Sequence, residues 1–262
     1  MSRTILITGG AGFVGSAIAL HWKARHPGDR VIAFDNLKRR GSELNLPRLK
    51  AAGIIFTHGD VRSLPDLMAV PRIDALVECS AEPSVLAGYG GDARYVVDTN
   101  LLGTVNCLEL VARDKADILF LSTSRVYPIA TINGSCMEVG GRFAIDPDAR
   151  VPGASEHGIS EDFPLRGVRS LYGTTKLSSE LLIAEQAAVH GFRWVVNRCG
   201  VIAGPWQMGK TDQGFVLLWL ARHQWGLPLS YTGFGGRGAQ VRDVLHVDDL
   251  CDLATLQLED MD

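Results

Sequence analysis

Residues 4–15 read TILITGGAGFVG, a short apolar run that leads into closely spaced glycines. The run has the length of a buried strand, and the residues that follow continue with helical spacing. Gly9, Gly12 and Gly15 allow a tight turn and let the backbone approach a pyrophosphate at the positive end of a helix. The glycine spacing alone also fits an ordinary turn, but the strand before it and the helix after it favour a dinucleotide site.

The rest of the chain repeats this alternation of short apolar runs and longer amphipathic segments. Strands are predicted near 3–8, 30–35, 54–57, 73–79, 117–122 and 193–199, and helices near 12–25, 43–52, 63–69, 93–113 and 171–190. Repeated βαβ units predict the α/β class, a Rossmann-type doubly wound parallel sheet with a smaller substrate-binding lobe. In the helix at 171–190, the spacing of Leu177, Leu181, Ala184 and Ala188 predicts the face that packs on the core.

Two segments interrupt this rhythm. Residues 128–170 are rich in proline and glycine and too long for a connecting loop, so we interpret them as an insert over the site. A second irregular part begins at Gly204. We therefore expect a dinucleotide-binding Rossmann domain at 1–203, which carries the insert, and the start of a substrate-binding lobe at 204–262.

The composition excludes several function classes. Of 262 residues, 46% are hydrophobic and 21% are charged, as in an ordinary globular protein, and the net charge of −3 offers no basic face for nucleic acid. No apolar stretch reaches the ~20 residues of a membrane span, and a strand-like run starts almost at once, so we expect a cytoplasmic protein without signal peptide or membrane contact. Five scattered cysteines predict reduced thiols, with no disulfide framework and no metal site.

Asp35 ends the second predicted strand, close to the ~20-residue offset expected for an acid that binds a ribose 2′-hydroxyl. Its charge would repel a 2′-phosphate, which favours NAD over NADP as the cofactor. The basic run 38–40 either offsets that repulsion or forms an exposed turn, and both interpretations stay open. Asp60, after the third strand, could accept a hydrogen bond from the adenine amine or cap the next helix.

Tyr172 and Lys176 lie four residues apart, on one face of a predicted helix. A free tyrosine has a pKa of about 10, and a nearby ammonium together with an oxidised nicotinamide would lower it. The phenolate could then take a proton from a sugar hydroxyl. An exposed Tyr–Lys pair is the alternative for the pattern taken alone. A third member is expected among residues 121–127, because hydroxyls at a carboxyl strand end face the ligand crevice, although they could also cap a turn.

At these residues the chain resembles the extended short-chain dehydrogenase/reductases, the sugar-nucleotide epimerases and dehydratases. The likeness rests on the glycine motif and on Asp35-Asn36-Leu37, Gly59-Asp60-Val61, Asn100 to Thr104, Ser122 to Tyr127, Tyr172 to Lys176 and Arg242 to Asp249. It implies that Thr123 orients the substrate hydroxyl, that Tyr172 is the base, and that Lys176 anchors the nicotinamide ribose. It also implies cofactor positions at Gly9, Gly12, Phe13, Gly15, Asp35, Asn36, Arg39, Asp60, Val61, Ala81, Asn100, Tyr172 and Lys176. Arg242 resembles the arginine that clamps the substrate diphosphate.

Within this family the chain is most similar to CDP-paratose (tyvelose) 2-epimerases, through residues 35–39, the long insert, Asp212-Gln213-Gly214 and residues 240–246. Ser124 and Arg125 stand where 4,6-dehydratases have an Asp-Glu pair, which argues against elimination of water. Val201 stands where 4-epimerases usually have an asparagine. Glu78 stands in the usual place of a histidine. The resemblance implies a lobe that extends past His246, so we expect this chain to hold only its beginning.

These observations predict an NAD-dependent epimerase of a nucleoside diphosphate sugar, with inversion at C2 of a CDP-sugar through a keto intermediate. A 4-epimerase, a net sugar-nucleotide dehydrogenase and a non-catalytic dinucleotide-binding subunit remain as alternatives. The helices near 93–113 and 171–190 could build a homodimer or homotetramer, as in relatives.

Overall fold

A computed structural model describes residues 2–209 and 214–261 of the chain, so Asp212 and Gln213 lie outside the described residues. Its central sheet has six parallel strands in the order β10-β5-β4-β1-β2-β3. They are β1 (Thr4–Thr8), β2 (Arg30–Asp35), β3 (Ile55–His58), β4 (Ala75–Glu78), β5 (Asp117–Thr123) and β10 (Trp194–Cys199). The order reverses between β1 and β4, as in the Rossmann fold, which confirms the predicted fold class.

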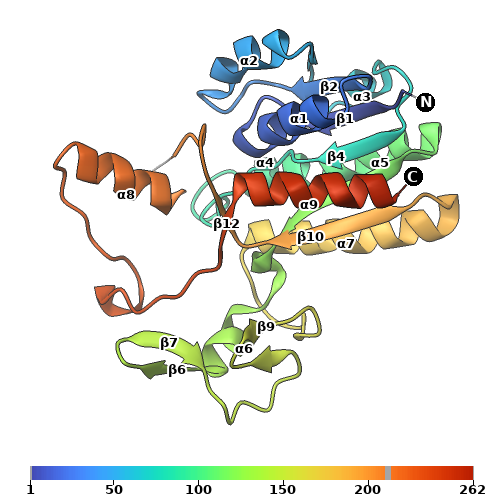
Figure 1. The fold of residues 1–262 in the computed structure, drawn as a ribbon. Coiled ribbons are helices and arrows are strands. Elements are labelled where there is room, and N and C mark those ends of the chain that lie inside the picture. Colours follow the sequence, from blue (N-terminus) through green and yellow to red (C-terminus); the bar gives the residue numbers. More distant parts are fainter. Residues whose placement is uncertain (1, 210–213, 262) are drawn as a thin grey trace.

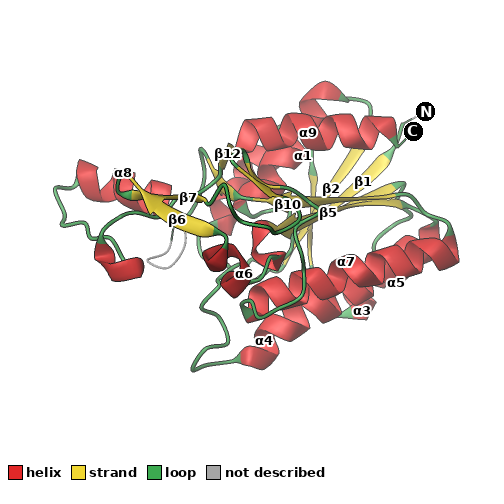
Figure 2. Cartoon of the chain, turned by 90° about the horizontal axis from the view of Figure 1, so that it is seen from below, coloured by secondary structure: helices red, strands yellow, loops and turns green. Residues whose placement is uncertain are grey.

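Helices cover both faces of the sheet, as Figure 2 shows from below. Packing on one face are α1 (Phe13–Arg25), α2 (Leu46–Ala51) and α9 (Val247–Asp260); on the other are α3 (Leu64–Met68), α5 (Gly103–Asp114) and α7 (Leu171–His190). The predicted helix near 93–113 comprises α4 (Ala93–Val97), a π-helical turn η2 (Asp98–Leu102) and α5. A 3₁₀ turn η1 (Ser42–Asn45) precedes α2.

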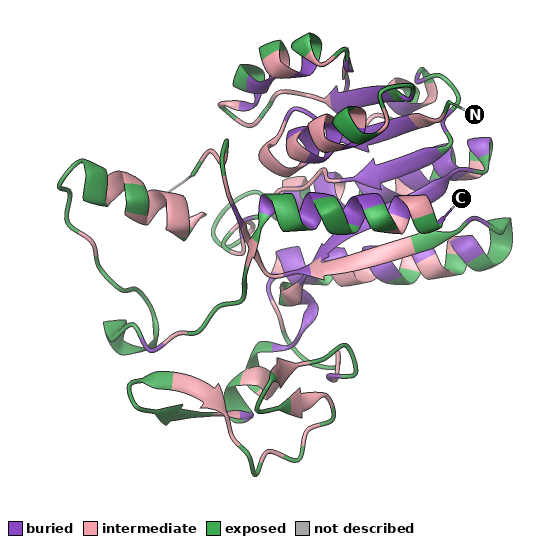
Figure 3. Cartoon of the chain, viewed as in Figure 1, coloured by how far each residue is buried: buried purple, intermediate pink, exposed green. Residues whose placement is uncertain are grey.

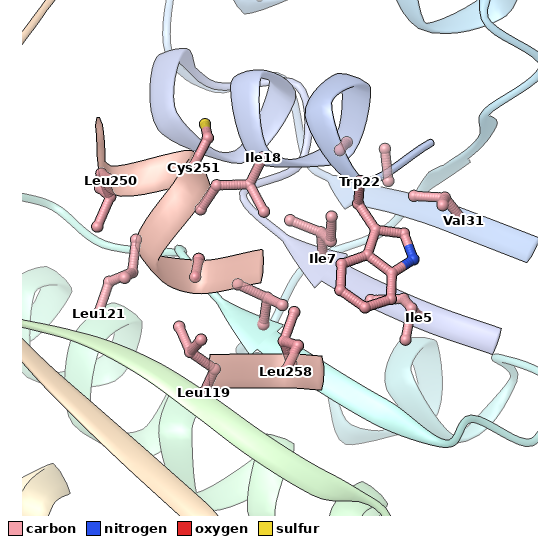
Figure 4. Close-up of a cluster of buried hydrophobic side chains, with 14 of the residues drawn as sticks. Ile5, Ile7, Ile18, Trp22, Val31, Leu119, Leu121, Leu250, Cys251 and Leu258 are labelled. Atoms are coloured by element: carbon pink, nitrogen blue, oxygen red, sulfur yellow. The ribbon is translucent and has the colours of Figure 1, made fainter. Parts of the chain in front are cut away.

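Side chains alternate along a strand, so successive residues of each central strand point to opposite faces of the sheet. On β1, Ile5 and Ile7 pack with α1 and α9, whereas Leu6 packs with the helices of the other face. Figure 4 shows the first of these clusters, with Trp22 and Leu258 closing it between α1 and α9. The inner strands β5, β4, β1 and β2 are therefore buried on both faces, which explains their nearly continuous apolar runs, whereas the edge strands β10 and β3 are only partly buried (Figure 3).

Helix α7 begins and ends where its sequence dictates. The Ser170 hydroxyl accepts a hydrogen bond from the backbone N–H of Gly173 (3.1 Å), and Gly191 takes a left-handed conformation after the last turn. The predicted core face is only partly right: Leu177 packs on a buried cluster, but Leu181 is 63% exposed, while Tyr172, Lys176, Ser179, Ile183 and Ala187 are buried. The stripe that faces the sheet is partly polar because it carries the site. A buried helix face with polar residues cannot be recognised from the spacing of apolar residues.

The insert at 128–170 folds beside the sheet as a small unit of its own (Figure 1). It contains α6 (Ile129–Gly134), the hairpin β6 (Cys136–Val139) and β7 (Arg142–Ile145), and the short pair β8 (Ala154–Ser155) and β9 (Gly158–Ile159). Its apolar cluster joins Phe163 to Val126 and Tyr127, which follow β5. The insert is therefore attached directly to the carboxyl end of β5.

The chain after β10 leaves the sheet and then returns to it. β11 (Val201–Ala203) pairs in parallel with β12 (Val244–His246), and between them lie α8 (Phe215–Gln224) and the turn η4 (Phe234–Gly236). In this part the Ala239 carbonyl accepts a hydrogen bond from the Phe143 N–H of β7 (2.8 Å). Helix α9 packs on α1 within the Rossmann core (Figure 1). The domain boundary at 203/204 stays a prediction.

None of the helices among the described residues is long and apolar enough to span a lipid bilayer.

Candidate active site

The glycine-rich turn lies between β1 and α1 and is held in one conformation by close contacts. Gly9 has a positive φ of 63°, and its carbonyl accepts the N–H of Gly12 (2.9 Å). A Cβ on Gly15 would lie 2.2 Å from the Gly9 carbonyl oxygen, so only glycine fits there. A Cβ on Gly12, by contrast, would meet only that oxygen, at 3.0 Å, so the outer side of the turn is open. This open backbone at a helix N-terminus fits a pyrophosphate.

Asp35 lies beside this turn, at the end of β2. Its carboxylate accepts hydrogen bonds from the backbone N–H groups of Leu37 (2.8 Å) and Ala11 (3.1 Å). Burial raises the pKa of this carboxyl, and the backbone donors oppose the rise. The structure thus brings the predicted ribose-binding acid next to the predicted pyrophosphate turn.

Asp60 forms an ion pair with Arg62, a residue that was not predicted to belong to the site. The Arg62 guanidinium donates to both carboxylate oxygens, at 2.9 and 2.6 Å, and the Asn36 amide donates at 3.0 Å. The paired Arg62 holds the pKa of Asp60 well below its usual range. Asp60 and Arg62 border a cavity of about 410 Å³ with Ser63, Arg94, Asp98 and Leu102. The basic residue two positions after the acid was the available signal.

Two of the predicted cofactor residues are tied to other parts of the protein. The Arg39 guanidinium donates to the Met208 carbonyl (2.7 Å), across to the chain after β11. Asn100 is fully buried, and its amide exchanges hydrogen bonds with the Glu82 backbone and donates to Thr175 on α7 (3.2 Å). Asn100 therefore fixes the loop after β4, which includes Ala81, against α7.

The remaining predicted cofactor residues lie around the same edge of the sheet. Val61 is buried against Gly103, where a Cβ would approach its side chain to 2.9 Å. Phe13 packs on the core cluster that α1 shares with α9.

Thr123 and Tyr172 meet where β5 ends and α7 begins. The Thr123 hydroxyl accepts the backbone N–H of Arg125 (3.2 Å), which leaves its own hydrogen for the Tyr172 phenol. Burial raises the pKa of Tyr172 to about 12, although Thr123 and the charge of Arg125 lower it. The lowered phenol pKa expected from the sequence is therefore not a property of the chain alone, because desolvation outweighs the nearby charges.

Helix α7 approaches the end of β5 closely because of a glycine in the Tyr–Lys motif. A Cβ on Gly173 would lie 2.1 Å from the carbonyl oxygen of Arg125. Lys176, one turn further on, is 2% exposed, and its Nζ lies 4.2 Å from the centroid of the Phe120 ring. The structure thus brings Thr123 and Tyr172 together, whereas the Lys176 ammonium lies over Phe120 and is not among the charges that act on the phenol pKa.

Arg242 lies on the exposed stretch before β12, and its guanidinium donates to the Gln240 side chain (3.2 Å). Partial burial and the charge of Arg125 lower the pKa of Arg242. The charge of Arg125 thus acts on both Arg242 and Tyr172, and two cations near one another suit an anion. In the sequence, Arg125 stands out only because dehydratases have a carboxylate at this position. Its electrostatic interaction with Arg242 is visible only in the folded structure.

A family model described as the NAD dependent epimerase/dehydratase family matches residues 5–262. The chain is 30% identical to a CDP-paratose 2-epimerase of Salmonella typhi over 95% of this chain and 72% of that protein. It is 31% identical to a dTDP-glucose 4,6-dehydratase of Streptomyces griseus over 95% of this chain and 67% of that protein. It is 28% identical to a dTDP-glucose 4,6-dehydratase of Mycobacterium tuberculosis over 94% of this chain and 65% of that protein.

Solved structures show the same fold. A dTDP-glucose 4,6-dehydratase of Streptomyces venezuelae, solved with NAD and TYD bound, superposes with a TM-score of 0.77 at 28% identity and covers 97% of this chain and 71% of that one. A UDP-glucuronic acid 4-epimerase of Bacillus cereus, in complex with UDP-glucuronic acid and NAD, gives 0.75 at 26% identity and covers 98% and 73%. The chain belongs to the NAD dependent epimerase/dehydratase family.

Proposed function

We propose that this protein is an NAD-dependent nucleotide-sugar epimerase that inverts C2 of a CDP-linked sugar through a keto intermediate. The observation that carries the proposal is the meeting of Thr123 and Tyr172 at the carboxyl end of β5, with Lys176 buried one turn further along α7. The similarity to the Salmonella CDP-paratose 2-epimerase supports the choice of sugar nucleotide and carbon.

The residues that would hold NAD are those of the open glycine turn and the acid beside it. Gly9, Gly12 and Gly15 leave backbone free for the pyrophosphate, and Asp35 would accept a ribose hydroxyl. Lys176 would anchor the second ribose. When bound, NAD would supply the hydride acceptor for oxidation of the sugar carbon and, in reduced form, the hydride donor for the keto sugar.

The chain itself supplies the proton chemistry. Tyr172 takes the proton from the sugar hydroxyl as that carbon is oxidised, and gives it back when the keto group is reduced. Thr123 donates its hydroxyl hydrogen toward the phenolate or the substrate oxygen, because its contact with the Arg125 N–H is one in which it accepts and leaves that hydrogen free. Burial of the phenol excludes water, which would otherwise compete for the proton.

The two arginines would hold the substrate's diphosphate. Arg242 and Arg125 present guanidinium forks that match phosphate oxygens and place the sugar near Tyr172. Elimination of water, the reaction of the dehydratase relatives, would need an acid next to Thr123. The next two positions are Ser124 and Arg125, so the local chemistry favours epimerisation.

Incubation with NAD and CDP-paratose or CDP-tyvelose tests the proposal, with NMR of the products. Interconversion of the two sugars, without accumulation of NADH, is the expected result. Inversion at C4 of another nucleotide sugar would indicate a 4-epimerase, and stoichiometric NADH a dehydrogenase. NAD binding by calorimetry without a response to any nucleotide sugar would indicate a non-catalytic subunit.

We further propose that the protein works in the cytoplasm as a homodimer or homotetramer. The five cysteines are free thiols, which suits a reducing compartment. The exposed Leu181 on α7 gives this helix an apolar side that a second copy could cover.

A further inference from the structure

A buried carboxylate lies under the site, at a position the proposed mechanism does not use. Glu78, the last residue of β4, is 1% exposed. Its Oε1 accepts the Thr104 hydroxyl of α5 (2.7 Å), but its Oε2 is buried with no hydrogen-bond partner among the described residues. A buried carboxylate with one unsatisfied oxygen is costly and calls for a nearby positive charge.

Lys176 provides such a charge on the same side of the sheet. Glu78 pairs directly with Phe120 across β4 and β5, and paired residues of neighbouring strands point to one face. The Lys176 ammonium lies over that Phe120 ring, with no hydrogen bond or salt bridge to any described residue. The Thr104 hydroxyl that donates to Glu78 is itself bonded to Ser179 of α7 (3.2 Å). The carboxylate and the ammonium therefore share one buried space.

Each of the two charges favours the ionised form of the other, whereas burial disfavours the ionised form of both. Burial raises the pKa of Glu78 to about 7, and Lys176 lowers it. Burial lowers the pKa of Lys176, and Glu78 raises it. An ammonium buried against an aromatic ring alone tends to lose its proton, because the ring compensates only part of the lost hydration.

The other titratable groups around the ammonium carry no charge near neutral pH. They are three thiols, and burial raises the pKa of each: Cys79 after β4, Cys107 on α5 and Cys199 at the end of β10. Tyr172, one turn earlier on α7, is likewise neutral in the chain alone. Glu78 is therefore the group that can balance the ammonium.

We propose that Glu78 is a positioning residue whose carboxylate keeps Lys176 protonated inside the protein. In the sequence it stands where the family resemblance expects a neutral or weakly basic histidine, so this counter-charge is a feature of this chain. Its consequence for turnover, a charged lysine available to the nicotinamide ribose, rests on the proposed function. The charge pair itself does not.

The test is an NMR titration of the Lys176 side chain in ¹³C-lysine-labelled protein, with the resonance assigned by Lys176→Met. In Glu78→Gln, which keeps an oxygen for Thr104 but loses the charge, the titration midpoint of Lys176 should fall by about one pH unit, a tenfold weaker hold on the proton. Thr104→Val is the matched control, because it removes the hydroxyl contact but leaves the carboxylate, and the midpoint should stay near that of the wild type. An equal midpoint in the wild type and Glu78→Gln would overturn the proposal.

The reciprocal measurement covers the case in which Glu78→Gln does not fold. In Lys176→Met, an infrared titration of the Glu78 carboxyl should show its midpoint about one pH unit higher than in the wild type, because coupling between two sites is mutual. An unchanged midpoint there would also overturn the proposal. Both titrations use the protein without substrate, so their failure is distinct from a failure of the CDP-sugar assay.

Discussion

Glu180 and Arg198 form a two-point ion pair that ties α7 to the last strand of the sheet. The Arg198 Nη2 and Nε lie 2.8 and 3.2 Å from the Glu180 Oε2, and Glu180 also accepts the Ser122 hydroxyl of β5. Arg198 donates in addition to the Tyr127 phenol at the base of the insert (3.3 Å). One buried network thus fixes the helix of Tyr172 relative to the sheet.

Loss of one partner of this network should be costly. Arg198→Met leaves the Glu180 carboxylate buried and unpaired, so we expect the free energy of unfolding in urea to fall by about 3 kcal/mol. The double variant Arg198→Met/Glu180→Met removes both charges and should regain most of that loss. A single variant as stable as the wild type would show that the pair does not hold α7.

Tyr172→Phe removes the proposed base and leaves the ring in place. Turnover should fall by about 10²–10⁴-fold, the usual worth of a positioned acid–base group. NAD affinity measured by calorimetry should change little, because the phenol contributes to chemistry more than to binding. Near-normal turnover in this variant would exclude Tyr172 as the base.

Arg242→Ala and Arg125→Ala test the proposed diphosphate site. Each should raise KM for the nucleotide sugar by roughly 10–100-fold, since a hydrogen bond to a charged group is worth about 1.5–3 kcal/mol. Arg242→Lys keeps the charge but not the fork and should recover only part of the loss. If KM stays constant in both alanine variants, the diphosphate binds elsewhere.

The free energy of unfolding should depend on pH through the titration of Glu78. Its pKa is about 7 in the folded chain against an ordinary value of 4.5, so between these values the folded state binds more protons than the unfolded state. Stability should therefore decline as pH rises from about 4.5 to about 7, by up to about 3 kcal/mol, and level off above. Urea unfolding at a series of pH values should show a flatter profile for Glu78→Gln than for the wild type, and identical profiles would contradict the assignment.

The exposed side of α7 should govern assembly. Leu181→Glu places a charge in the proposed interface and should shift the protein toward the monomer in light scattering. Leu86→Glu is the matched control, because Leu86 is exposed to nearly the same degree (61%) on the loop after β4. Equal masses for both variants and the wild type would exclude α7 from an interface.

The strands could be predicted from the sequence because each depends on a short run of neighbouring apolar residues. Apolar runs such as 4–8 and 30–35 are buried on both faces, so burial and sequence pattern coincide, and each predicted strand is confirmed within a few residues. Helix α7 shows the limit. Its buried face carries Lys176 and Glu180, so hydrophobic periodicity selected the neighbouring stripe one position further along, in which Leu181 is exposed.

The sequence by itself determined the Rossmann fold, the glycine turn with Asp35, and the Tyr172–Lys176 spacing, because each depends on residues within one or two adjacent elements. Only the tertiary structure decided which charges meet. Arg62 pairs with Asp60, the charge of Arg125 acts on Arg242, and Glu78 shares a buried space with Lys176 although 98 positions separate the last pair in sequence. Electrostatic energies depend on distance and burial, and neither is defined until the strands are ordered and the helices are packed on them.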